Sequence, residues 1–357
     1  MAEEKTHATL SPSSADRWMT CMGSVILTKD LPNTDNAYST EGTDYHEVGA
    51  YCLEEGVEAA SLVGRPMKSG AIATEENLQF VQDYVEVIQS HVDEGGQLLV
   101  EEAVPISHLT GEPEAEGTSD AIIQRADREL VIGDLKFGRG VQVQAEGNRQ
   151  AKIYALGAIE KHLLHDRYDT VRLLISQPRN GGTSEDVISM SDLLSFGKEV
   201  TRAAKRILTV TDDGTLVFTP NLPLVPSEKA CRFCKLNTKV AGKIECPALR
   251  ETVETAMGDG FQHLDKDEAT DVVLANIAEM PAETALGAAA DMADLVEIWL
   301  KGVRARVEAE LLAGTPVIGR DGAYKLVQGK KGNRKWTDEK ATEEMLKSFR
   351  LKVPEMY

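Results

Sequence analysis

Two short β-forming runs place acidic residues where a hairpin would bring them together. Residues 119–125 and 129–135 are rich in apolar and β-branched side chains and are separated by a polar turn, which predicts a hairpin. If this hairpin turns at Asp127, Asp120 lies opposite Asp134. Directly opposed side chains in such a pair have Cβ atoms about 4.5–5.5 Å apart. Two carboxylates that close repel each other unless a cation lies between them or one is protonated.

A lysine follows the second acid on the same face of the strand. Side chains alternate between the two faces of a strand, so Lys136 shares a face with Asp134. Two acids and an amine suit phosphodiester hydrolysis, because carboxylate oxygens hold a divalent cation that polarises phosphate and activates water. The amine would orient or deprotonate the water or stabilise the developing charge. The alternative is an exposed hairpin with ordinary surface charges, since an Asp-x-Lys sequence alone is common.

Two further segments carry polar residues that fit such a site. His46 lies in a helix expected at residues 41–54. Gln150 and Tyr154 are four positions apart in a helix expected at residues 142–163, so they share one helix face. Taken singly, the histidine fits an ordinary helix position with satisfied hydrogen bonds, and the tyrosine fits a core position.

In this order, the residues resemble the RecB-like branch of the PD-(D/E)xK nucleases. The pattern of that branch is a histidine in an early helix, Gly-x-x-Asp, a hydrophobic strand ending in Asp-x-Lys, and Gln-x-x-x-Tyr. The resemblance implies bound Mg²⁺ or Mn²⁺, a catalytic lysine, and a Gln/Tyr pair that contacts DNA or orders the site. The implied metal ligands are His46, Asp120, Asp134 and the carbonyl oxygen of Leu135, and the other implied site residues are Lys136, Gln150 and Tyr154.

Relatives of this group often carry a glutamate before the Gly-x-x-Asp segment. Glu101 and Glu102 occupy that region here, within a β-rich run at residues 97–104. The sequence favours an acid at the surface edge of a strand for either of them.

The five cysteines are too few, and odd in number, for a disulfide scaffold. Cys231 and Cys234 form a Cys-x₂-Cys pair, Cys246 follows after eleven residues, and Cys21 lies far upstream. Four thiolates suit an iron–sulfur cluster or Zn²⁺, and reduced structural cysteines are the third alternative. Cys52, in the helix of the candidate histidine, is expected to be a buried apolar residue.

This split set is similar to that of the AddB-type helicase–nucleases and the CRISPR-associated RecB-like nucleases. In both groups one cysteine lies in a serine-containing segment before the nuclease core, three follow the core, and together they hold a [4Fe–4S] cluster. The segment from Ser11 to Cys21 matches the first part, and Cys231, Cys234 and Cys246 match the second. The gap before Cys246 is longer than is usual in such sets. The resemblance implies a structural cluster that closes a very long loop and restricts the unfolded chain.

Charge limits the classes of partner. The net charge of −19 over 357 residues argues against a general nucleic-acid binder, which is usually basic. Residues 136–179 nevertheless carry eight Lys/Arg against four Asp/Glu, and residues 320–352 carry ten against five. These two stretches could contact phosphates or could be ordinary solvated faces. The basic and aromatic stretch at residues 324–336 likewise suits either a single-strand contact or a surface hairpin.

Nothing in the sequence predicts membrane association. The first residues are polar, without the apolar stretch of a signal peptide. A membrane-spanning helix needs roughly 18 or more apolar residues in a row, and no such run occurs. The expected location is the cytoplasm, that of a bacterial host if the chain is phage-encoded.

Periodicity and turn residues predict an α/β fold with a mixed sheet flanked by helices. Thr40 is expected to cap the first long helix, and Ser11 a short one that begins with Pro12. Further helices are expected at 75–92, 192–209 and 284–312, and further strands at 171–177 and 185–190. The resemblance implies a PD-(D/E)xK restriction-endonuclease-like core with a helical iron–sulfur lobe and a C-terminal extension. The expected divisions are 1–40 (a segment supplying a cluster cysteine), 41–215 (nuclease core), 216–255 (cluster segment) and 256–357 (helical and basic extension).

The expected function is a Mg²⁺- or Mn²⁺-dependent deoxyribonuclease, with exonuclease action on linear or single-stranded DNA favoured. The alternative is a non-catalytic protein on the same fold that binds DNA ends or assists recombination. The overall layout resembles RecB-like proteins of bacteriophages and prophages. Phage recombination or replication proteins and further copies of the chain are therefore the partners to consider.

Overall fold

The computed structural model describes residues 8–32, 37–93, 95–164, 166–242, 244–257, 287–319 and 322–327. The chain forms two compact units, Met1–Arg306 and Val307–Tyr357. The described part of the second unit holds the end of helix α11 (Gly287–Leu312) and a short hairpin of β8 (Ile318–Gly319) and β9 (Gly322–Ala323). The expected C-terminal basic stretch lies largely outside the described residues.

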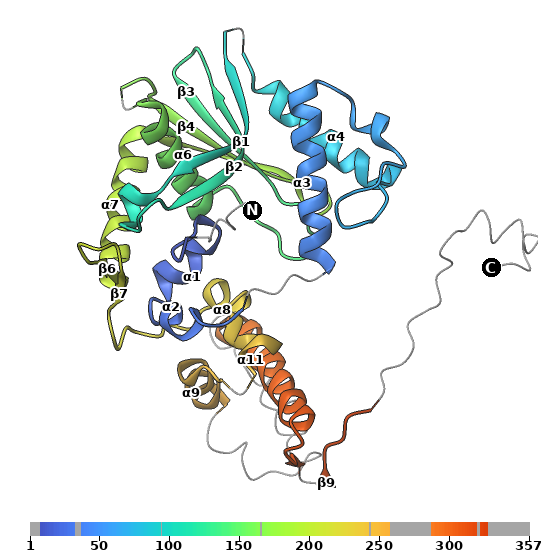
Figure 1. Cartoon of the computed structure of the whole chain (residues 1–357), viewed down its shortest axis with the longest axis vertical. Coiled ribbons are helices and arrows are strands. Elements are labelled where there is room, and N and C mark those ends of the chain that lie inside the picture. The colour runs from blue at the N-terminus through green and yellow to red at the C-terminus, as the bar shows by residue number, and fades with distance from the viewer. Residues whose placement is uncertain are drawn as a thin grey trace, which may run out of the picture. The chain divides into compact units, whose positions relative to one another are not determined.

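A mixed sheet of five strands forms the centre of the first unit (Figure 1). Neighbouring strands are antiparallel except β3 and β4, which run parallel. The parallel pair needs a crossover connection, and helix α6 (Arg149–His162) supplies it. The predicted α/β class with a mixed, helix-flanked sheet is therefore confirmed. The strands in sheet order are β1 (Gln97–Pro105), β2 (Glu116–Gln124), β3 (Glu129–Leu135), β4 (Thr170–Gln177) and β5 (Gly182–Ser189).

The register of the central hairpin is the one that the sequence predicts. Ile122 pairs with Ile132, and Gln124 pairs with Leu130. The ladder ends at the pair of Ala121 and Gly133. The next residues outward are Asp120 and Asp134, the two acids of the predicted pair. The two acids therefore lie at the open end of the hairpin, away from its turn.

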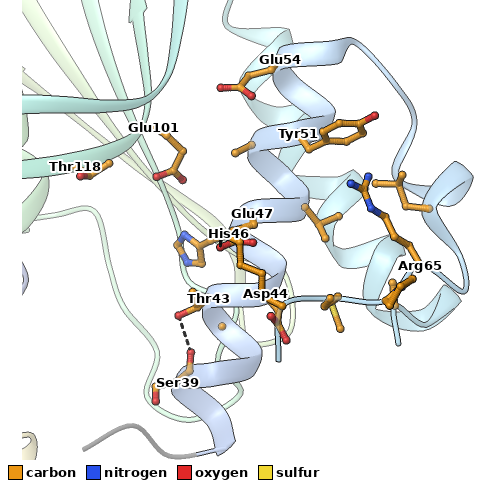
Figure 2. Close-up of a pocket in the computed structure, with 18 of the residues that line it drawn as sticks. Ser39, Thr43, Asp44, His46, Glu47, Tyr51, Glu54, Arg65, Glu101 and Thr118 are labelled. Atoms are coloured by element: carbon orange, nitrogen blue, oxygen red, sulfur yellow. Dashed lines mark hydrogen bonds and ion pairs between the residues drawn. The ribbon is translucent and has the colours of Figure 1, made fainter. Parts of the chain in front are cut away.

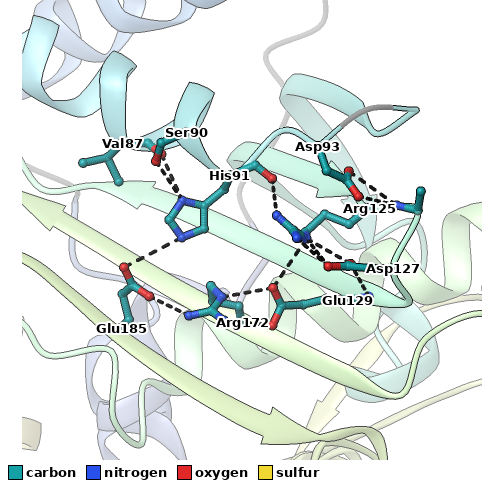
Figure 3. A network of polar contacts seen from close by, with 10 residues as sticks. Val87, Ser90, His91, Asp93, Arg125, Asp127, Glu129, Arg172 and Glu185 are labelled. Carbon is teal, nitrogen blue, oxygen red and sulfur yellow. Dashed lines mark hydrogen bonds and ion pairs between the residues drawn. The ribbon is translucent and has the colours of Figure 1, made fainter.

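Ion pairs at the turn hold the other end of this hairpin (Figure 3). Arg125 donates to the Asp127 carboxylate from Nε at 3.0 Å and to the carbonyl of His91 from Nη1 at 2.8 Å. Arg172 of β4 lies between Glu129 of β3 and Glu185 of β5, at 3.1 and 2.6 Å. Because these contacts tie the turn to three neighbouring elements, they resist slippage of the hairpin, which would separate the acids.

Apolar side chains alternate between two cores, one on each face of the sheet. Ile122 and Ile132 belong to the core that contains α6 and α7 (Met190–Ile207). Ile123 and Val131 belong to the core that contains α3 (Ala37–Glu55) and α4 (Glu75–Ser90). Figure 1 shows the two pairs of helices on opposite faces of the sheet. Helices thus cover both faces of the sheet, as expected for strands whose sequences are nearly continuous runs of apolar residues.

Helices α3 and α6 have starts that differ from the prediction. Helix α3 already includes residues 37–40, so Thr40 lies inside the helix and does not cap it. Thr43 donates its hydroxyl to the Ser39 carbonyl at 3.1 Å, a contact that satisfies a polar side chain within a helix. Helix α6 begins at Arg149, later than expected, because Gly147 has a positive φ of 68° and Asn148 caps the helix. Helix α4 begins at Glu75 as predicted, with the Thr74 hydroxyl accepting from the Asn77 N–H, and ends at Ser90, two residues before the expected end.

The N-terminal segment packs into the core that contains α6 and α7. Ser11 precedes a short 3₁₀ turn that starts at Pro12, but its side chain makes no capping bond. Helix α1 (Ala15–Thr20) and α2 (Gly23–Thr28) follow. Leu10 and Trp18 are fully buried, and the Trp18 indole N–H donates to the Ser11 carbonyl at 3.0 Å.

The cysteine-containing segment is built of short elements in the first unit. These are β6 (Leu208–Val210), β7 (Leu216–Phe218), α8 (Glu228–Arg232) and α9 (Pro247–Met257). A small apolar cluster joins α8 and α9 to Leu295 and Ile298 of α11. None of the helices within the described residues combines the length and apolarity that crossing a membrane requires.

Two glycine-to-alanine changes within helices test the packing of α6 on the sheet. A Cβ on Gly157 would lie 2.9 Å from Val104 Cβ and 3.0 Å from the Pro105 carbonyl oxygen, both in β1. We expect Gly157→Ala to lower the free energy of unfolding by about 1–3 kcal/mol, because neither neighbour can move freely. Urea unfolding followed by circular dichroism measures this change.

Gly42→Ala is the matched control. Gly42 lies in α3, and a Cβ there would meet nothing within 4 Å. This change should raise stability by up to about 1 kcal/mol, since alanine favours the helix more than glycine does. Equal effects at the two positions would contradict the close helix–sheet contact.

Candidate active site

Polar side chains from β1, β2, β3, α3 and α6 meet at the open end of the hairpin. His46 Nδ1 of α3 lies 3.3 Å from Asp120 Oδ2 of β2. The same Asp120 oxygen accepts a hydrogen bond of 2.7 Å from the Leu135 backbone N–H. Asp120 is thus held by the third strand and by the first long helix together. Figure 2 shows His46 on the side of α3 that faces Glu101 of β1.

A second group of contacts surrounds Asp134. Its side chain is 2% exposed, and its Oδ2 lies 2.7 Å from Lys136 Nζ. Gln150 of α6 donates from Nε2 to Asp134 Oδ1 at 3.0 Å and accepts from Lys136 Nζ at 3.0 Å. Gln150 Nε2 also lies 3.2 Å from the hydroxyl of Tyr154. The amide therefore fixes the acid and the amine relative to each other.

Every side chain that the sequence assigned to this site lies within these two groups. The structure brings together His46, Asp120, Asp134, Lys136, Gln150 and Tyr154. For Leu135 the described contact is that of its N–H, so the part predicted for its carbonyl stays a prediction.

Glu101 is the site residue that sequence reasoning missed. Its side chain is exposed, as expected, but one of its oxygens, one ring nitrogen of His46 and one oxygen of Asp120 all lie within 4.8 Å of one another. The ladder between β1 and β2 is interrupted at this position, and Glu101 has a positive φ of 48°. Such a backbone costs a non-glycine residue about 1 kcal/mol or more, and it turns the carboxylate towards the site. A local kink of this kind leaves no clear signal in a β-rich sequence.

Gly117 allows the N-terminal segment and α6 to approach the site closely. A Cβ on Gly117 would lie 2.8 Å from the Tyr154 ring and 2.9 Å from Pro12. Any larger residue would displace the tyrosine, and with it the amide of Gln150. The glycine of the Gly-x-x-Asp segment therefore has a packing role here.

A column of stacked groups fixes the positions of the histidine and the lysine. Tyr45, next to His46, stacks on Phe137, next to Lys136, with ring centroids 4.4 Å apart. The Arg179 guanidinium lies 4.6 Å over the other face of Phe137. Arg179 also donates to Glu41 of α3 at 2.9 Å, which closes the link back to the helix. Each aromatic residue directly precedes or follows a site residue, so the column limits how far α3 and the end of β3 can separate.

The carboxylates differ in how readily they ionise. Burial opposes ionisation of Asp120, but the hydrogen bond and charge of His46 outweigh it, so the pKa of Asp120 lies below its ordinary value. Burial raises the pKa of Asp134, and the charge of Asp120 raises it further, whereas Lys136 opposes the rise. For Lys136, burial lowers the pKa, but the charges of Asp134 and Asp120 raise it above the ordinary value. The amine is therefore protonated at neutral pH.

The histidine and the glutamate hold protons more tightly than usual. Burial lowers the pKa of His46, but the hydrogen bond and charge of Asp120 more than compensate, and the pKa is raised. Burial, together with the charge of Asp120, raises the pKa of Glu101 to about 7. A metal ion that binds here must displace these protons, so its affinity is expected to depend on pH.

The donor set fits a hard divalent cation. Carboxylate oxygens and one imidazole are typical ligands of Mg²⁺ and Mn²⁺. Asp134 is almost fully buried, and its Oδ2 is paired with the Lys136 ammonium at 2.7 Å. Glu101 and Asp120 lie near His46 in the same region, and a further cation would offset the repulsion between the three carboxylates. His46, Glu101, Asp120 and Asp134 are therefore the candidate ligands.

Four of the five cysteines lie near one another, apart from this site. Burial raises the pKa of Cys231 to about 11, and the charges of Cys234, Cys21 and Cys246 add to the rise. Cys21 Sγ accepts from the Val225 N–H at 3.3 Å, which joins α1 to the segment before α8. The four thiols predicted to act together are thus neighbours. Cys52 is fully buried in the core beneath α3, as expected of an apolar residue.

A half-buried arginine, Arg17, lies near two of these thiols. Arg17 donates to the Ser24 hydroxyl at 3.1 Å. Burial lowers its pKa, and the charges of Cys234 and Cys21 oppose that shift. The cation would therefore offset part of the negative charge of a thiolate site.

Fold and site together define an α/β protein with an acidic, histidine-containing centre at the open end of its sheet hairpin. Residues 7–357 match the family described as protein of unknown function DUF2800. The match covers nearly the whole chain, and the chain belongs to this family.

The raised pKa of Glu101 predicts a pH-dependent stability of the metal-free protein. Between the ordinary value of 4.5 and about 7, the folded state binds more protons than the unfolded state. The free energy of unfolding therefore falls as pH rises through this range. We expect Glu101→Gln to reduce the fall in Tm between acidic and neutral pH, and to weaken the rise in Tm that Mn²⁺ causes at neutral pH.

Glu102→Gln is the matched control, because Glu102 lies 2.8 Å from Lys161 in an ion pair outside the site. Its response to Mn²⁺ should equal that of the wild type in thermal unfolding by calorimetry. If both variants respond to Mn²⁺ as the wild type does, Glu101 is not a ligand.

Proposed function

We propose that this protein is a metal-dependent deoxyribonuclease with a PD-(D/E)xK core. The observation that carries the proposal is the convergence of Asp120, Asp134 and Lys136 at one end of a sheet, with Oδ2 of Asp134 and Nζ of Lys136 2.7 Å apart. Surface charges brought together by chance are seldom buried, whereas Asp134 is 2% exposed. Burying charge costs stability, and buried charged groups of this kind are typical of catalytic and binding sites.

The proposed metal is Mg²⁺ or Mn²⁺, held by His46, Asp120, Asp134 and the Leu135 carbonyl, with Glu101 as a further candidate ligand. Such an ion supplies Lewis-acid activation of the phosphate and of the attacking water. The remaining steps depend on the side chains around it.

Lys136 is the proposed catalytic lysine. Protonated and close to Asp134, it stabilises the negative charge that develops on the phosphate. Gln150 accepts a hydrogen bond from its ammonium group at 3.0 Å, which restricts the directions in which the group can point. Fixed donors of this kind are effective because no reorganisation is needed during the reaction.

Gln150 and Tyr154 are proposed to order this arrangement. The Gln150 amide donates to Asp134 and accepts from Lys136, so one side chain fixes the positions of the carboxylate and the ammonium group. Tyr154 lines the cavity beside the site and supports the amide from the same helix face.

Hydrolysis of labelled linear DNA with Mn²⁺ tests the activity. We expect Asp134→Ala and Lys136→Ala to lower kcat by a factor on the order of 100 or more, because the first removes a proposed metal ligand and the second removes the amine that stabilises the phosphate charge. Gel analysis of the products over time also shows whether cleavage starts at ends.

Asp83→Ala and Lys161→Ala are the matched controls for acid and amine. Asp83 is exposed on α4, where it accepts from Gln79 at 3.1 Å, and Lys161 pairs with Glu102 at 2.8 Å. Both should retain wild-type activity. A wild-type protein that binds DNA ends but never cuts would favour the alternative, a recombination accessory protein on the same fold.

We further propose that Cys21, Cys231, Cys234 and Cys246 hold a [4Fe–4S] cluster. Their mutual influence on pKa supports a shared site. The split of one cysteine before the core and three after it, similar to that of the AddB-type helicase–nucleases, favours the cluster over zinc. Its proposed role is structural.

Iron and sulfide analysis of anaerobically purified protein tests the cluster. We expect about four of each per chain in the wild type, with broad visible absorption. Cys21→Ser and Cys246→Ser should lose both iron and sulfide, whereas Cys52→Ser should retain them because Cys52 belongs to another core. Zinc in place of iron would exclude the cluster.

A further inference from the structure

A groove leads away from the candidate site across the exposed face of α3. Its volume is about 990 Å³. Figure 2 shows Glu101 and Thr118 on one side of α3, and Tyr51 and Arg65 on the other. The site and a distant basic loop therefore border the same cavity. The lining includes His46, Glu101 and Tyr154 at the first end and Tyr51, Arg65 and Lys68 at the second.

The second end of the groove carries a stacked arginine. The Arg65 guanidinium lies 4.6 Å from the centroid of the Tyr51 ring, and both side chains are exposed. Among the described residues, Arg65 has no carboxylate within ion-pair distance. An aromatic ring beneath a guanidinium holds its plane in place and leaves its N–H donors free for an anion.

The loop that carries Arg65 is built to hold it there. The Ala73 N–H donates to the Arg65 carbonyl at 3.0 Å, and Pro66 forms a β-bridge with Ile72. The Ser69 N–H donates to the buried Asp44 carboxylate of α3 at 3.2 Å, which ties the loop to the helix. The position of Arg65 is therefore fixed before any ligand binds, which reduces the entropy lost on binding.

The acidic side chains of the groove either pair with neighbouring residues or lie at the end that contains the candidate metal site. Asp44 is held by Ser69, and Glu47 forms an ion pair with Lys68. Glu54 and Glu101 lie towards the sheet, where Glu54 adds to the raised pKa of Glu101. What remains at the far end is the unpaired charge of Arg65, which suits an anionic ligand.

We propose that this groove binds single-stranded DNA, with a backbone phosphate of the strand held by Arg65 on the Tyr51 ring while another phosphate lies at the metal site. This assignment rests on the proposed nuclease function and names the form of its substrate. The volume is that of a pocket for a small or medium ligand, which accommodates a few nucleotides of one strand. One chain of phosphates, running from His46 across α3, meets both ends of the groove.

Binding of a fluorescein-labelled oligo(dT) strand, with Ca²⁺ in place of Mn²⁺ to prevent cleavage, tests the proposal. We expect Arg65→Ala to raise the Kd about tenfold, the effect of losing a charge-assisted contact. The slope of log Kd against log salt concentration should fall by about 0.7, the value for one phosphate of a single strand. Tyr51→Ala should weaken binding less, and Tyr51→Phe should leave it unchanged because the ring remains.

Arg167→Ala is the matched control. Arg167 is also an exposed arginine over a tyrosine ring, 5.6 Å from the centroid of Tyr168, but it lies outside the groove. Its removal should alter neither the Kd nor the salt slope. Equal binding by wild type and Arg65→Ala, or an equal loss in Arg167→Ala, would overturn the assignment. Equal weakening of a hairpin duplex by Arg65→Ala would overturn the restriction to single strands.

Hydrolysis of bis(p-nitrophenyl) phosphate separates this proposal from the nuclease function. This small diester reaches the metal site without crossing α3, so Arg65→Ala should hydrolyse it at the wild-type rate. A loss of that activity in Arg65→Ala would mean that Arg65 acts on the site itself, and the groove assignment would fail. If the wild type leaves both this ester and DNA intact, the nuclease proposal fails, while the oligo(dT) measurement still decides whether the groove binds a strand.

Discussion

Repulsion between two carboxylates is the constraint around which this fold is organised. Asp120 and Asp134 lie at the open end of one hairpin, and their charges raise the pKa values of nearby groups, including Lys136 and His46. Left alone, such a pair would push the strands apart or take up a proton. The lysine, the histidine and the Gln150 amide hold the pair together from three separate elements. The ion pairs at the turn and the stacked column beside α3 restrain the elements that carry these charges.

The site and the cysteine segment depend on the same N-terminal residues. Pro12 packs beside Gly117 and Tyr154, while Cys21, nine positions later, accepts a hydrogen bond from Val225. Any group held by the four thiols would therefore also restrain the segment that packs on Tyr154. The proposed cluster and the proposed active site are thus joined through a few residues, even though they lie apart.

Much of the hairpin could be predicted because its chemistry is local. Alternating apolar residues and a short polar turn set the register, and the register alone places Asp120, Asp134 and Lys136 together. Helical spacing puts Gln150 and Tyr154 on one face, and the resemblance to RecB-like nucleases assigned that face to the site. Glu101 could not be found in this way, since its orientation depends on an interrupted ladder and a positive φ. The start of α3 was missed because Thr40 resembles a cap but lies within the helix. The stacked column and the groove combine residues from distant segments, and only tertiary packing brings these together.

The wide separation in sequence between α1 and α8 has a consequence for how the protein is made. Cys21 leaves the ribosome long before its proposed partners, because Val225 and the other three thiols come more than two hundred positions later. At about 5–20 residues per second, the interval is on the order of tens of seconds. The sheet core can bury Trp18 as it assembles, whereas Cys21 stays without its partners until Val225 and the three later thiols have been made. The nascent chain would therefore pass through a stage that is open to chaperones or proteases, and that ends only when the last thiols emerge.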